Sequence, residues 1–66
     1  MDRDEIFKFI SETGRRTLHE IRAQFSSSNQ EILDSILIYL TERHQVRKVS
    51  FQASYGKEDL YYILPK

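Results

Sequence analysis

The chain lacks cysteine and tryptophan and has one proline and two glycines among its 66 residues. Without cysteine it cannot form a disulfide, a thiolate nucleophile or a cysteine-ligated zinc site, so its stability has to come from packing. A chain of this length encloses only one small hydrophobic core. The sequence therefore predicts a single domain over residues 1–66.

The chain also lacks an excess of charge of either sign and a long apolar run. Ten Lys and Arg residues balance ten Asp and Glu residues. A neutral domain has no long-range attraction to nucleic acid, so any such binding would depend on local patches. No apolar segment approaches the ~20 residues of a membrane span, and the charged N-terminus differs from a signal peptide. We therefore expect a cytoplasmic protein, or a nuclear one in a eukaryote, with no membrane partner.

Apolar residues at helical spacing predict a first helix over residues 3–13. Four of them share one face: Ile6, Phe7, Phe9 and Ile10. Asp2 or Asp4 can cap the N-terminus of this helix, and Gly14 can end it because glycine accepts a left-handed backbone. Residues 15–17 are then expected to form a short extended link.

Two capping-box patterns predict where the second and third helices begin. The segment Thr17-Leu18-His19-Glu20 would start a helix that ends near residue 25, and Ser28-Asn29-Gln30-Glu31 would start the next one. The third helix has the densest apolar pattern, and five residues are expected on its core face: Ile32, Leu33, Ile36, Leu37 and Leu40. Ile38 should point away from this face, with Tyr39 on the flank.

After His44 the apolar period changes from near four to two, which predicts a β-hairpin. We expect strands over 46–51 and 60–64, joined by a polar tip over 53–59 that is longer than a two-residue turn. Pro65 should end the last strand. One of Tyr61 and Tyr62 should pack inward, and the other should half-cover the outer face.

This α+β arrangement of three helices and a C-terminal hairpin resembles the winged helix-turn-helix superfamily over nearly the whole chain. The family pattern at the end of the third helix is a leucine, three polar residues, a glycine and then a branched apolar residue. Leu40, residues 41–43, His44, Gln45 and Val46 occupy that pattern, with His44 in place of glycine. Histidine tolerates a left-handed backbone at a cost of about 1 kcal/mol. The segment 14–21 is also similar to winged-helix regulators of bacterial ferrous iron transport, but their cysteine cluster is absent, so no iron chemistry carries over.

The resemblance implies a DNA-binding or transcription-regulatory module. Five basic residues are the expected phosphate contacts, at the helix ends and in the hairpin: Arg15, Arg16, Arg47, Lys48 and Lys57. Three residues of the third helix have side chains suited to base edges: Asn29, Gln30 and Ser35. The alternative interpretation, which the balanced charge of the chain favours, is that these basic residues are an ordinary solvated set of charges.

A second interpretation is a protein-interaction module, for a partner or a second copy. The outer face of the third helix carries carboxylates that phosphates would repel, and Ile38 leaves apolar area in water. The residues expected at such a contact are Asp34, Ile38, Tyr39 and Glu42. Glu31 has an ordinary explanation, since acids are favoured at helix N-termini.

The sequence contains no pattern typical of an active site. His19 and His44 are the only imidazoles and have no metal-ligand spacing, while Ser26, Ser27 and Ser28 have no base to activate them. A small interior also leaves little room to exclude water from a reaction. We therefore expect no enzyme activity, cofactor, metal or small-molecule substrate.

Overall fold

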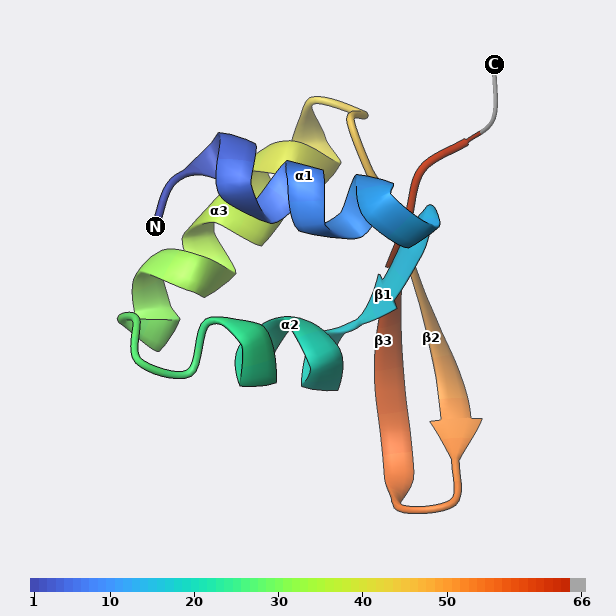
Figure 1. The fold of residues 1–66 in the computed structure, drawn as a ribbon. Helices are drawn as coiled ribbons and strands as arrows, with labels where there is room; N and C mark the ends of the chain where they lie inside the picture. Colours follow the sequence, from blue (N-terminus) through green and yellow to red (C-terminus); the bar gives the residue numbers. More distant parts are fainter. Residues whose placement is uncertain (65–66) are drawn as a thin grey trace.

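The computed structural model describes residues 1–64 and is a small α+β domain in which three helices lie on one side of a three-stranded antiparallel sheet (Figure 1). The elements, in chain order, are α1 Arg3–Thr13, β1 Arg15–Thr17, α2 Leu18–Gln24, α3 Gln30–Glu42, β2 Arg47–Ala53 and β3 Gly56–Tyr62. The lower part of the β2–β3 hairpin extends past α2. Within residues 1–64, no helix has the length and apolarity needed to cross a membrane.

The predicted boundaries of α1 and α2 are confirmed by their caps. Asp2 accepts a hydrogen bond from the Glu5 amide, and Gly14 ends α1 with a left-handed φ of 83°. At α2, the Glu20 amide donates to the Thr17 hydroxyl, and the Thr17 amide donates to the Glu20 carboxylate. This reciprocal capping box satisfies two amides that the helix leaves without partners.

The capping box predicted at Ser28–Glu31 is wrong, because Asn29 caps α3 instead. Its side-chain oxygen accepts from the Glu31 and Ile32 amides at 2.9 and 3.2 Å. Asparagine is among the strongest N-caps, and here one oxygen serves two amides. The Ser28 carbonyl accepts from the Gln30 side chain at 3.0 Å. The helix therefore begins at Gln30.

The sheet is larger than predicted, because the expected link over residues 15–17 is the strand β1. It pairs with β3, which places β3 between β1 and β2. The Ile63 amide donates to the Gly14 carbonyl at 2.9 Å and continues this pairing beyond the strand. A polar segment such as Arg15–Thr17 carries no strand signal of its own, and its pairing depends on where β3 lies.

The predicted hairpin exists, but its predicted boundaries are wrong. The turn is only Ser54 and Tyr55, since Ala53 pairs with Gly56, and the last strand ends at Tyr62. The polar residues 57–59 continue β3 because each has a partner in β2; the Ser50 hydroxyl, for example, donates to the Asp59 carboxylate at 2.7 Å. Pro65 lies outside the described residues.

The core lies between the helices and the sheet, and eight side chains are buried in it: Ile6, Ile10, Ile21, Leu33, Leu37, Leu40, Val46 and Tyr61. Each contributes about 1.5–3 kcal/mol by burial. The inward Tyr61 and half-buried Tyr62 confirm the predicted alternation. The prediction that Ile32 lies on the core face of α3 is wrong, since this residue is 52% exposed. It lies in the first turn of α3, about a quarter turn from the centre of the core face.

The connection from α3 to β2 uses the left-handed conformation predicted for His44, which has φ 59°. The His44 amide donates to the Thr41 carbonyl and the Gln45 amide to the Leu40 carbonyl, both at 3.0 Å. These bonds satisfy carbonyls at the end of α3 that have no partner within the helix. The backbone then turns sharply and places Val46 in the core.

Candidate binding surfaces

Arg22 joins α2 to α3 through two of the predicted contact residues. Its guanidinium forms an ion pair with Asp34 at 2.9 Å and donates to the Gln30 side-chain oxygen at 3.1 Å. The Gln30 side-chain nitrogen in turn donates to the Phe25 and Ser28 carbonyls. Gln30 and Asp34 therefore hold the turn between the two helices. Sequence reasoning missed this pairing because the partners lie on different helices, and no local spacing connects them.

The other two residues expected at base edges also have partners within the chain. Asn29 caps α3 with its side-chain oxygen, and the Ser35 hydroxyl donates to the Glu31 carbonyl at 3.0 Å. Base reading needs side-chain donors and acceptors directed outward at the groove. At each of the three positions, side-chain polar atoms that could serve that role bond within the chain instead: the Asn29 oxygen, both polar atoms of Gln30 and the Ser35 hydroxyl.

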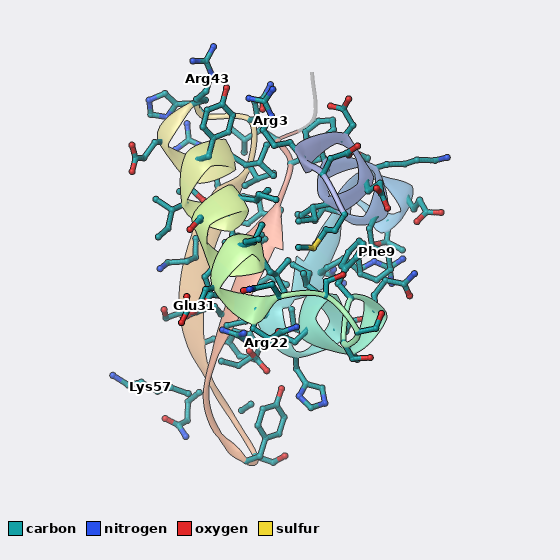
Figure 2. All side chains as sticks on the ribbon, turned by 90° about the vertical axis from the view of Figure 1, so that its left-hand side faces the viewer. Arg3, Phe9, Arg22, Glu31, Arg43 and Lys57 are labelled. Atoms are coloured by element: carbon teal, nitrogen blue, oxygen red, sulfur yellow. The ribbon has the colours of Figure 1, made fainter. Side chains whose placement is uncertain are left out.

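The outer α3 face is the surface formed by Glu31, Ile32, Ser35, Ile38 and Glu42. Ile32, Ser35 and Ile38 follow one another at intervals of three, which places them on one diagonal row of the helix. Ile32 and Ile38 are 52% and 58% exposed, and Glu31 and Glu42 are also exposed. Within residues 1–64, neither carboxylate has a cationic group within 4.0 Å. This face is turned toward the viewer in Figure 2, where Glu31 is labelled.

Tyr39 lies beside this face and is covered by two arginines. The guanidinium carbons of Arg3 and Arg43 are 4.7 and 5.3 Å from the centre of its ring (Figure 2). Both distances are within the range of cation–π attraction. Tyr39 therefore links α1 to the end of α3. A partner that contacted this side of α3 would meet Arg3 and Arg43 together with the half-buried Tyr39 ring.

Arg16, an expected phosphate contact, is engaged by the fold. Its Nε donates to the Phe9 carbonyl at 3.1 Å, its guanidinium lies 3.9 Å from the centre of the Phe9 ring, and it reaches the Glu20 carboxylate at 3.6 Å. The side chain is only 20% exposed. It connects α1 to the start of α2 and has little surface left for a ligand.

The remaining four cations are divided between the two faces of the sheet. Arg15 and Arg47 both lie opposite Tyr62, so their side chains share the outer sheet face, which turns away from the helices. Lys48 and Lys57 occupy alternate positions in the ladder and belong to the other face. The structure therefore pairs Arg15 with Arg47 and separates both from the lysines.

The outer sheet face is hollowed beside Arg15. A surface groove of about 460 Å³ crosses it, and its lining is mainly apolar: Thr13, Gly14, Arg15, Val49, Leu60, Tyr62 and Ile63. Val49 and Phe51, its neighbour on this face, are 46% and 40% exposed. Sequence reasoning missed this face because it assigned no register to the hairpin and no strand to residues 15–17, and the face depends on Val49 lying opposite Leu60 and Arg15 opposite Tyr62.

Three side chains have shifted pKa values, and each shift has a local cause. The hydrogen bond from the Thr17 amide lowers the pKa of Glu20, with help from Arg16. The Tyr55 hydroxyl donates to Glu58 at 2.6 Å, which raises the pKa of Tyr55. Burial raises the pKa of Tyr61. All three groups support the fold, and across residues 1–64 no three His, Asp or Glu residues cluster as a metal site would require.

Comparison with known proteins returns no match from family models, curated proteins or solved structures.

Proposed function

We propose that this chain is a non-catalytic winged-helix module that binds a protein partner through the outer α3 face. The order α1-β1-α2-α3-β2-β3, with an extended C-terminal hairpin, supports the winged-helix assignment. The observation that carries the function is the exposure of Ile32 and Ile38 on a face bordered by Glu31 and Glu42, neither of which forms an ion pair within residues 1–64. Exposed apolar rows with a charged border are typical of protein contacts.

The same face disfavours the usual docking of a winged helix in the DNA major groove. Glu31 and Glu42 would enter a region surrounded by phosphates, where carboxylates are repelled unless they accept from cytosine. Isoleucine at the centre of that contact offers no hydrogen bond. The partner that fits is a protein surface with apolar side chains flanked by lysine or arginine, because its charge complements the two glutamates.

The test is capture of a partner by the full chain, with variants at two equally exposed aliphatic residues. Ile38→Asp should abolish capture, since a carboxylate would have to be buried without a partner. Leu64→Asp is the matched control, because Leu64 is 51% exposed and lies outside α3. Glu42→Lys should weaken binding more at low salt than at high salt. Equal capture by Ile38→Asp and the unaltered chain would refute the proposal.

DNA binding is the second candidate, and it is favoured by the placement of Arg15 and Arg47 on one row of the outer sheet face. In this case the sheet and the hairpin would contact phosphates, and α3 would stay outside the groove. A transcription-regulatory role would then require that the chain binds duplex DNA. The double variant Arg15→Ala, Arg47→Ala should bind the duplex more weakly, and its binding should depend less on salt concentration. Fluorescence anisotropy with a duplex at low salt measures both effects.

A further inference from the structure

Strand β2 is an edge of the sheet, and its free side is available for pairing. Within residues 1–64 it pairs with β3 alone, on one side, and residues 47–52 are all exposed. The turn at Ser54 and Tyr55 fixes which backbone groups point outward. Because only two residues separate Ala53 from Gly56, that pair is of the hydrogen-bonded kind. Alternation along β2 then directs the N–H and C=O groups of Lys48, Ser50 and Gln52 away from β3.

The helices leave this open β2 edge uncovered. Lys48, Ser50 and Gln52 have their side chains on the helix side of the sheet, yet all three are exposed. The helices that contact the sheet, α1 and α2, do so at β1 and β3, and Figure 1 shows β2 on the far side of the hairpin. An unpaired edge of seven residues without proline or a bulge is a template for another strand.

We propose that two copies of this chain pair their β2 strands antiparallel about a two-fold axis at Ser50. The two three-stranded sheets would then join into one continuous sheet. Ser50 would face Ser50 of the partner subunit, and Lys48 would face Gln52 of the partner subunit. These residues are the ones whose backbone groups point outward, so this register forms two hydrogen bonds in each of three residue pairs.

Charge and side-chain complementarity favour a second copy of this chain as the partner that pairs with the open β2 edge. In this register neither Arg47 nor Lys48 lies opposite a cation, and the chain as a whole is neutral. Val49 would lie opposite Phe51 of the partner subunit, on both sides of the axis. β-Branched and aromatic residues pair favourably across strands, and this contact would cover side chains that are 46% and 40% exposed. The interface is isologous and closes with two subunits, which prevents open-ended growth.

This inference is independent of the proposed function. The outer α3 face and the open β2 edge belong to different elements and share no residue. A variant that cannot dimerise should still capture the partner that Ile38→Asp loses, and the Ile38→Asp variant should still dimerise.

The first test changes one backbone group on the open edge. Ser50→Pro removes an outward N–H and leaves the bonds to β3 in place, since proline is tolerated on edge strands where the N–H faces solvent. Ser50→Ala is the matched control: it also loses the hydroxyl that bonds Asp59 but keeps the amide. By sedimentation equilibrium up to about 1 mM, the unaltered chain and Ser50→Ala should dimerise, and Ser50→Pro should remain a folded monomer.

The second test reads the register and does not depend on proline. Gln52→Lys places a cation opposite Lys48 of the partner subunit at two symmetric positions and should raise the dissociation constant at least about tenfold. Adding Lys48→Glu to the same chain turns both repulsive pairs into attractive ones and should restore the affinity. Three results would overturn the proposal: the unaltered chain is a monomer at about 1 mM, Ser50→Pro still dimerises, or Gln52→Lys leaves the dissociation constant unchanged.

Discussion

His44 is the residue where a single substitution should make this domain more stable. It holds φ 59° just after α3, a left-handed conformation that glycine adopts without steric cost. A left-handed backbone costs an L-residue about 1–2 kcal/mol. Replacement by glycine removes that cost but adds about 0.4–1 kcal/mol of unfolded-state entropy. His44→Gly should therefore stabilise the domain by about 0.8 kcal/mol, which raises Tm by about 3–6 °C in a domain of this size.

The assay is thermal and urea unfolding followed by circular dichroism. The imidazole is exposed and takes no part in the bonds that close α3, which are made by backbone groups of residues 40–46. His44→Ala is the matched control, because it removes the imidazole but keeps the Cβ atom in the left-handed conformation. Its Tm should equal or fall below that of the unaltered chain. An equal gain from alanine and glycine, or a loss with glycine, would refute the argument from backbone strain.

Three further predictions concern stability. Glu20 has a lowered pKa in the folded chain, so its contribution to the free energy of unfolding is present above its ordinary pKa of 4.5 and is lost as pH falls through the folded pKa. Glu20→Gln should remove this part of the acid sensitivity, which is worth about 0.2–1 kcal/mol for so exposed a group. Urea unfolding at pH 7 and pH 3 measures it. Burial raises the pKa of Tyr61, so the folded chain loses stability as pH rises above 10, where this tyrosine ionises in the unfolded chain before it does in the folded one. Tyr61→Phe should reduce this alkaline loss of stability in thermal melts between pH 9 and 11. An unchanged loss would contradict the role of burial. Leu37→Ala should cost about 2–5 kcal/mol, a large part of the roughly 3–10 kcal/mol total, and a cooperative melt of nearly unchanged midpoint would contradict its place in the core.

The candidate sites show where sequence reasoning reached its limit. The outward direction of Ile38 followed from helical periodicity alone, and its 58% exposure confirms it. Asp34 lay on the same side by periodicity, but its carboxylate is paired with Arg22 from another helix. Such a pairing depends on how two helices meet, and helical periodicity describes only one helix at a time.

The sequence by itself determined the elements whose signals are local. The reciprocal cap of Thr17 and Glu20, the end of α1 at Gly14 and the core row Leu33, Leu37 and Leu40 depend on residues within a turn or two of one another. The tertiary structure decided what depends on distant segments: the strand at residues 15–17 exists because β3 lies beside it, and the cations divide because alternate residues of a paired strand face opposite ways. A polar strand becomes recognisable only when its partner is in place, because its hydrogen bonds join residues more than forty positions apart.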